Sequence, residues 1–300
     1  MRRFIYFLFI VGIAGAAVVC FAPNEIWQTP QIIAGARKDP ARGEQIFLLA
    51  GCASCHTDTK ENAPPLAGGR QLKTEFGVFV APNITPDPAT GIGKWTDIDF
   101  VRAMTQGLSP TGKHYYPSFP YTSYTRMPVQ DILDLKAYLD TVKPVSNKTA
   151  AHELSFPYSI RYGVGFWKLA FFDNRRFVPA PGKPESLNRG AYLATGPGHC
   201  IECHSPRNFA GAIEKDRAFS GTKKAPEGGK VPNITPHPET GIGKWSESDM
   251  LEFLKSGLTP GGDITGGTMG EVIKNTSKWD EADRKAVVEY LRSLPPRALQ

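Results

Sequence analysis

Cys52–His56 reads Cys-Ala-Ser-Cys-His, and Cys200–His204 reads Cys-Ile-Glu-Cys-His. Both stretches of this 300-residue chain follow the pattern CxxCH, in which two thiols stand three positions apart and a histidine comes next. Two thiols at this spacing can add to the two vinyl groups of one haem, and the adjacent imidazole can then bind the iron. The two stretches therefore predict two covalently bound haem c groups.

Other roles of paired cysteines explain these motifs less well. A structural disulfide, a thioredoxin-like redox pair and a zinc site all use paired cysteines, but none of them requires a histidine directly after both pairs. A thioredoxin site also needs a βαβ setting, which the surrounding sequence lacks. The predicted residues for covalent haem attachment are Cys52, Cys55, Cys200 and Cys203, and the predicted proximal iron ligands are His56 and His204.

The sequence repeats itself at a long interval, which defines its domains. Val80–Trp95 contains Asn-Ile-Thr-Pro and Gly-Ile-Gly-Lys-Trp, and Val231–Trp245 contains both again. The haem motifs recur at nearly the same offset of about 150 residues, as expected for a tandem duplication. We therefore predict two haem domains, residues 37–150 and 185–300. An aromatic and proline-rich connection, residues 151–184, joins them, and its aromatic residues serve either to pack the domains together or to dock a partner.

Each copy is predicted to contain the same three helices. The first leads into the CxxCH motif and carries a glycine, Gly43 or Gly190, which either lets another helix approach closely or has no special role. The second begins at a capping box, and the third shows apolar residues at helical spacing. No alternating strand pattern competes with these helices, so the predicted fold class is all-α. The predicted helices lie at Asp39–Leu49, Thr96–Leu108, Ile132–Val142, Glu185–Leu193, Ser246–Leu258 and Ala286–Leu294.

Methionine is the first candidate for the second axial ligand of each iron. Met104 and Met250 lie at helical spacing among apolar residues, which is typical of a core position. Met127 and Met269 are expected in the loops between the second and third helices, where the chain can fold over the open haem face. Histidine–methionine ligation raises the haem potential and closes the iron to substrates, which suits an electron carrier.

Two features leave alternatives open at the second ligand. Met127 lies 19 positions after Leu108, whereas Met269 lies only 11 positions after the matching Leu258, so the two ligand loops cannot superpose. His114 and, less plausibly, His152 are the alternative ligands of the first haem. The asparagines and tryptophans of the repeated segments, Asn83, Asn233, Trp95 and Trp245, serve either to position the ligand loop and haem propionates or simply to pack the repeat.

The N-terminus predicts a membrane location. Arg2 and Arg3 precede Phe4–Ala22, an uncharged and mostly apolar stretch of about 19 residues, which is near the length that spans a bilayer. The positive-inside bias keeps the arginines cytoplasmic and places the rest of the chain on the periplasmic side of a bacterial inner membrane. We expect residues 1–22 to be an uncleaved anchor followed by a linker, 23–36. A cleaved signal peptide is the alternative.

Charge argues against nucleic-acid binding. The 35 Lys and Arg residues exceed the 29 Asp and Glu residues by six, and 21% of the chain is charged. The basic residues are scattered along the chain in runs no longer than a pair. A nucleic-acid-binding domain would gather them on one face.

The repeated Asn-Ile-Thr-Pro and Gly-Ile-Gly-Lys-Trp segments, together with Tyr116–Met127, resemble the cytochrome c subunits of bacterial membrane-bound alcohol, aldehyde and gluconate-type dehydrogenases. The resemblance extends from Asp39 to Pro296. It implies a tandem of two class I cytochrome c-like haem domains behind an N-terminal membrane helix, with Met127 and Met269 as iron ligands. It also implies a catalytic partner subunit of the flavin, quinone or molybdenum type, and quinone or an oxidase chain as acceptor. Many such subunits carry three haem motifs, whereas this chain carries two.

Two other functional classes remain alternatives to an electron-transfer subunit without substrate chemistry of its own. One is a catalytic diheme enzyme of the peroxidase type, in which an iron must open to peroxide. The other is the diheme cytochrome subunit of a haem-copper oxidase, which has a similar length and one anchor.

Overall fold

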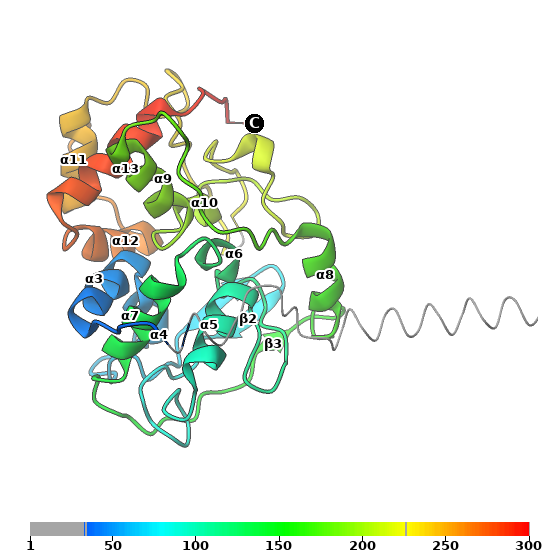
Figure 1. The fold of residues 1–300 in the computed structure, drawn as a ribbon. Helices are drawn as coiled ribbons and strands as arrows, with labels where there is room; N and C mark the ends of the chain where they lie inside the picture. Colours follow the sequence, from blue (N-terminus) through cyan, green and yellow to red (C-terminus); the bar gives the residue numbers. More distant parts are fainter. Residues whose placement is uncertain (1–32, 34, 226, 300) are drawn as a thin grey trace, which may run out of the picture.

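The computed structural model describes residues 33, 35–225 and 227–299, which form two mostly helical halves that pack against each other (Figure 1). The first half contains α3 (Pro40–Ala50), α4 (Cys52–His56), α5 (Asp97–Gln106), α6 (Tyr121–Tyr124) and α7 (Val129–Leu139). The second contains α9 (Glu185–Thr195), α10 (Cys200–Cys203), the 3₁₀ turn η1 (Lys215–Arg217), α11 (Glu247–Ser256), α12 (Gly267–Thr276) and α13 (Glu281–Ser293). The predicted anchor, residues 1–22, lies outside the described residues. Among the described residues, no helix has the length and apolar character needed to cross a membrane.

The first and last helices of each half cross at a glycine. A Cβ atom at Gly43 of α3 would lie 1.9 Å from the carbonyl oxygen of Asp134 in α7. A Cβ atom at Gly190 of α9 would lie 1.9 Å from the carbonyl oxygen of Ala286 in α13. The predicted close approach at these two glycines is confirmed, because no larger residue fits between the helices.

The predicted starts of α3, α5 and α11 are confirmed, whereas α7 and α13 begin at Val129 and Glu281, before the predicted Ile132 and Ala286. The Asp39 carboxylate accepts hydrogen bonds from the backbone N–H groups of Ala41 and Arg42, and Pro40 is the first helical residue. Thr96 and Ser246 form complete capping boxes at α5 and α11 with the acidic residue three positions later. These short-range patterns are local, so the sequence alone determines them.

A small sheet corrects the all-α prediction. β1 (Gln71–Thr74) and β2 (Gly77–Val80) form an antiparallel hairpin, and β3 (Glu153–Leu154) pairs with the other edge of β2. Each hairpin strand has only four residues, too few for alternation to stand out from the loop around it. The hairpin also depends on the distant β3, because Gly77 lies so close to Glu153 that a Cβ atom would be 2.3 Å from its carbonyl oxygen.

The connection between the halves contains β3 and α8 (Gly163–Phe171), which lies beside both halves (Figure 1). The Trp167 indole N–H donates to the carbonyl oxygen of Ala210 in the second half at 2.8 Å. The Lys168 ammonium donates to the carbonyl oxygens of Gln106 and Gly107 in the first half at 2.6 and 2.8 Å. The packing role predicted for the connection is therefore confirmed. Its outer surface still exposes apolar side chains: Phe156, Ile160, Tyr162, Phe166 and Leu169.

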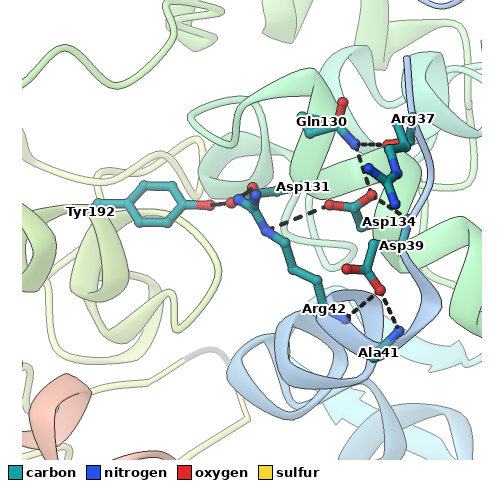
Figure 2. A network of polar contacts seen from close by, with 8 residues as sticks. All are labelled: Arg37, Asp39, Ala41, Arg42, Gln130, Asp131, Asp134 and Tyr192. Atoms are coloured by element: carbon teal, nitrogen blue, oxygen red, sulfur yellow. Dashed lines mark hydrogen bonds and ion pairs between the residues drawn. The ribbon is translucent and has the colours of Figure 1, made fainter.

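A polar network joins the two halves on the side of α3 and α7 (Figure 2). Arg42 forms ion pairs with Asp131 and Asp134, and Asp134 also accepts the backbone N–H of Asp39 at 2.9 Å. The Tyr192 hydroxyl, from α9 of the second half, donates to Asp131 at 2.6 Å. Because Tyr192 and Asp131 are both buried, their bond fixes the second half against the α3–α7 pair.

Candidate haem sites

The two CxxCH motifs form short helices directly after the first helix of each half. α3 ends at Gly51, whose left-handed backbone (φ 61°) turns the chain into α4. α9 is followed by a longer turn that ends at His199, also left-handed (φ 37°), before α10. Each motif is thus presented at the end of a helix whose other face packs on the last helix of its half.

The motif histidines have the same orientation in both halves. His56 Nδ1 lies 2.8 Å from the carbonyl oxygen of Pro82, and His204 Nδ1 lies 2.8 Å from the carbonyl oxygen of Pro232. A ring nitrogen bonded to a carbonyl carries the proton, so Nε2 keeps a free lone pair for a metal. Burial lowers the pKa of both imidazoles, although the carbonyl contact opposes this effect. Both rings are therefore neutral, as an iron ligand must be.

The motif thiols are available for attachment. Cys52, Cys55, Cys200 and Cys203 are all free. Burial raises the pKa of Cys52 and Cys200 to about 12. With two protonated thiols and one oriented neutral imidazole in each half, the donor set fits a covalently attached haem.

The repeated Asn-Ile-Thr-Pro segments hold the carbonyls that orient the histidines. The Asn83 amide donates to the carbonyl oxygen of Val145 at 2.7 Å, and its oxygen accepts the backbone N–H of Thr85 at 2.9 Å. Asn233 repeats both bonds with Arg297 at 2.5 Å and with Thr235 at 2.8 Å. Both asparagines are buried and their amides are fully used, so they tie the repeated loop to the end of each domain.

Met127 lies in the predicted loop, between α6 and α7, and its side chain is 0% exposed. Its backbone N–H donates to the carbonyl oxygen of Tyr124 at 2.9 Å. Its own carbonyl accepts a hydrogen bond from Arg176 Nη1 at 2.7 Å, and Arg176 also bonds the carbonyl of Thr125 at 2.9 Å. The segment that carries Met127 is thus held by its own backbone bond to Tyr124 and by the Arg176 side chain of the connection.

Met269 does not lie in a loop, which corrects the expectation for the second domain. It is the third residue of α12, a helix that begins at Gly267 and has no side-chain cap. Ile273 and Thr276 are buried, and the Thr276 hydroxyl bonds the carbonyl of Leu254 in α11 at 2.5 Å. Compared with the first domain, the second domain has fewer residues between its second helix and the methionine, and more residues between the methionine and its last helix. The longer segment after Met269 forms a helix that packs on α11.

The alternative histidines are engaged elsewhere. His152 Nδ1 accepts the backbone N–H of Val80 at 3.1 Å, so His152 packs on the sheet. His114 is buried, and its Nδ1 lies 3.1 Å from the Lys168 ammonium. His237 takes the place of Asp87 in the repeated turn and accepts the same pair of backbone N–H groups.

The structure also reveals contacts between the two motifs and the opposite halves that sequence reasoning did not find. Glu202, within the second motif, accepts hydrogen bonds from Thr122 and Ser123 in α6 at 2.6 and 2.7 Å. Ser54, at the same position of the first motif, accepts a hydrogen bond from Asn275 in α12 at 2.7 Å. Burial raises the pKa of Glu202, but Arg207 and the two hydroxyls outweigh it, so the net shift is downward. The only sequence signal was the charged Glu202 between the two cysteines of the second motif, where the first motif has the neutral Ser54.

The family model for cytochrome c matches residues 40–143 and again residues 188–295. This chain belongs to the cytochrome c family. The double match agrees with the tandem repeat, and the chain carries two covalently bound haem c groups, as its two CxxCH motifs predict.

Curated relatives share most of this chain. A protein described as "Diheme cytochrome c-type" from Cereibacter sphaeroides is 44% identical over 96% of each chain. The cytochrome c subunit of alcohol dehydrogenase (quinone) from Gluconacetobacter polyoxogenes is 36% identical over 95% of this chain and 62% of its own length. The fructose dehydrogenase cytochrome subunit from Gluconobacter japonicus is 37% identical over 87% of this chain and 54% of its own. The predicted resemblance to dehydrogenase cytochrome subunits is confirmed, and this chain spans little more than half the length of those subunits.

Proposed function

We propose that this cytochrome is the electron-transfer subunit of a dehydrogenase complex. It takes electrons from a catalytic subunit of the flavin, quinone or molybdenum type and passes them to quinone or to a terminal oxidase chain. The names of its relatives support this class of partner. The bound haems supply one-electron chemistry, and the protein itself performs no substrate chemistry.

The observation that carries the proposal is the duplicated geometry of the histidines. Cys52 and Cys55 attach one haem, with His56 and Met127 as iron ligands. Cys200, Cys203, His204 and Met269 hold the other in the same way. Since His56 and His204 meet equivalent carbonyls at 2.8 Å, the chain orients two iron-binding imidazoles alike. Two irons that each had a histidine and a methionine ligand would serve an electron relay, whereas a peroxidase needs one iron that opens to its substrate.

The proposed location is the periplasmic side of the bacterial inner membrane, with residues 1–22 as the anchor. The apolar stretch Phe4–Ala22 after Arg2 and Arg3 supports this location.

The test is purification of the full-length chain from its native membranes in detergent, followed by identification of the co-purifying subunits. We expect a flavin, quinone or molybdenum dehydrogenase, and we expect its substrate to reduce both haems, seen in the visible absorbance. A chain lacking residues 1–22, exported by a separate cleavable signal, should leave the membrane fraction. Co-purification of copper oxidase subunits, or rapid reoxidation of the reduced haems by peroxide, would instead assign the chain to one of the alternative classes.

A further inference from the structure

The contact between Glu202 and α6 crosses from one haem site to the other. Glu202 belongs to the second attachment motif, two positions before His204. Thr122 and Ser123 lie in α6, the helical turn that leads to Met127 in the first domain. A single buried carboxylate therefore connects the haem attachment of one domain with the methionine segment of the other.

Both carboxylate oxygens of Glu202 are engaged. One carboxylate oxygen accepts both hydroxyl groups, at 2.6 Å from Thr122 and 2.7 Å from Ser123, and the other pairs with Arg207 at 2.8 Å. The side chain is only 8% exposed. Hydrogen bonds to a buried charged group are short and strong, and a hydroxyl that loses such a partner inside a protein is left unsatisfied.

The chain between Ser123 and Met127 transmits this contact, because consecutive backbone hydrogen bonds stiffen it. The backbone N–H groups of Thr125, Arg126 and Met127 donate to the carbonyls of Tyr121, Ser123 and Tyr124, each at 2.9 Å. The Tyr124 hydroxyl also donates to the carbonyl of Ala50 at the end of α3, at 3.2 Å. A shift of Ser123 thus moves the backbone of Met127.

The equivalent contact in the other direction is weaker. Ser54 occupies the same position of its motif as Glu202, and it accepts one neutral hydrogen bond from Asn275 at 2.7 Å. Asn275 also donates to the carbonyl of Glu271 within its own helix, α12, which carries Met269. The two contacts therefore occupy equivalent positions in the domain interface, but only the Glu202 contact involves a charged side chain.

We infer that Glu202 is a positioning residue for Met127, so that the second haem-attachment motif controls the axial ligation of the first haem. This inference rests on the proposed role of Met127 as an iron ligand. It makes the two haem sites one coupled unit: a change in the second motif reaches the first iron through α6, whereas a change at Ser54 has little effect on the second iron.

The test compares Glu202→Ala, Glu202→Gln and Thr122→Val with Ser54→Ala in the full-length protein with both haems. The readouts are the red charge-transfer band of methionine-ligated ferric haem and the midpoint potentials from a redox titration. Met127→Ala and Met269→Ala identify which part of the band and which potential belong to each haem. We expect Glu202→Ala to diminish the Met127 part of the band and to lower the midpoint potential of the first haem. Glu202→Gln and Thr122→Val should have the same effects to a smaller degree. Ser54→Ala should leave both parts of the band intact.

The outcomes separate this inference from the proposal on which it rests. If Met127→Ala leaves the band unchanged, the ligand assignment is wrong and the inference falls with it. If Met127→Ala removes its part of the band but Glu202→Ala and Thr122→Val alter only the second potential, the ligand assignment stands and the positioning role of Glu202 is overturned. The milder Glu202→Gln and Thr122→Val variants decide the question where Glu202→Ala does not mature.

Discussion

In the first domain, Met127 comes twelve positions after Tyr115, in a buried loop that Arg176 fixes from the connection. In the second domain, Met269 comes only four positions after Thr265, in the first turn of a helix and partly exposed. Tyr115 and Thr265 are equivalent, because both donate a backbone hydrogen bond to the glycine that ends the second helix. The methionine segments of the two domains therefore diverge after this point.

This difference shows that the histidine and the methionine of each site are positioned by different kinds of contact. The histidine side of each site depends on a loop that is nearly identical in both copies and is held within its own domain. The methionine side depends on what packs against it from outside: α6 contacts the second domain, and Arg176 of the connection bonds the Met127 carbonyl. We expect variants of the shared features to affect both domains equally and variants of the divergent features to affect one domain.

The largest effects are expected from Met127→Ala and Met269→Ala. Each should lower the potential of its own haem on the order of 0.1 V, because axial ligands tune haem potentials over roughly 0.8 V and methionine raises them. Only Met127→Ala should also destabilise the protein by about 2 to 5 kcal/mol, since Met127 is fully buried and its loss leaves a cavity. Redox titration and denaturant unfolding measure the two effects.

Leucine variants at the same positions separate the two effects. Met127→Leu keeps the packing volume without the sulfur, so it should shift the potential yet restore most of the stability. Equal loss of stability in Met127→Ala and Met269→Ala would contradict the difference in burial between the two ligand segments.

The next largest effect, about 3 kcal/mol, is expected from Gly43→Ala and Gly190→Ala. In both, the new methyl group meets a backbone carbonyl of the facing helix at 1.9 Å, so the helices must move apart. Because the geometry is the same in both halves, hydrogen exchange should rise in α7 for Gly43→Ala and in α13 for Gly190→Ala to a similar degree. Gly163→Ala serves as the control, since its Cβ position is in open space and its backbone is not left-handed. A large effect in only one half would mean that the helix pairs are not equivalent.

Much of this architecture follows from short-range patterns. The CxxCH motifs, the repeat, the capping boxes at Thr96 and Ser246, and the crossing glycines are all visible in the sequence, and the structure agrees with each. They are predictable because the interactions involved lie within a few residues or recur in both copies.

What the sequence did not reveal depends on contacts between distant segments. The β1–β2 hairpin is completed by β3, about 75 residues later. The helix at Met269 forms because it packs on α11, and the Glu202 carboxylate finds its partners in α6 of the other domain. Tertiary contacts of this kind override local patterns, and a single sequence does not show them.

A pH-dependent stability of about 2 kcal/mol is expected from Lys168, a residue of α8 in the connection that hydrogen-bonds to the first domain. Burial lowers the pKa of Lys168 to about 7, although two carbonyls and the Tyr121 ring, 4.6 Å from the ammonium, surround it. A lysine in the unfolded chain has a pKa near 10.4, so the unfolded state binds more protons between pH 7 and 10 and the folded state gains stability as pH rises. Lys168→Met should lose this gain of about 2 kcal/mol between pH 7 and 9.

Denaturant unfolding at pH 7, 8 and 9 measures this effect, and Lys113→Met, at an exposed lysine of the first domain, is the matched control. The control should keep the pH dependence of the original protein. If Lys168→Met keeps it as well, Lys168 stays protonated in the folded state throughout this range, and its two carbonyl partners outweigh the cost of its burial.

The smallest effect, about 1 kcal/mol for each variant, is expected from Thr96→Ala and Ser246→Ala, because both remove the same capping box. The consequences should nevertheless differ along the helices. α5 buries six of its residues, whereas α11 buries only Met250, so α5 is held by packing after its first turn is loosened. Hydrogen exchange should therefore rise only in the first turn of α5 in Thr96→Ala but along most of α11 in Ser246→Ala. The same pattern in both helices would show that α11 is held as firmly as α5, and would leave the methionine segments as the one place where the two domains differ in stability.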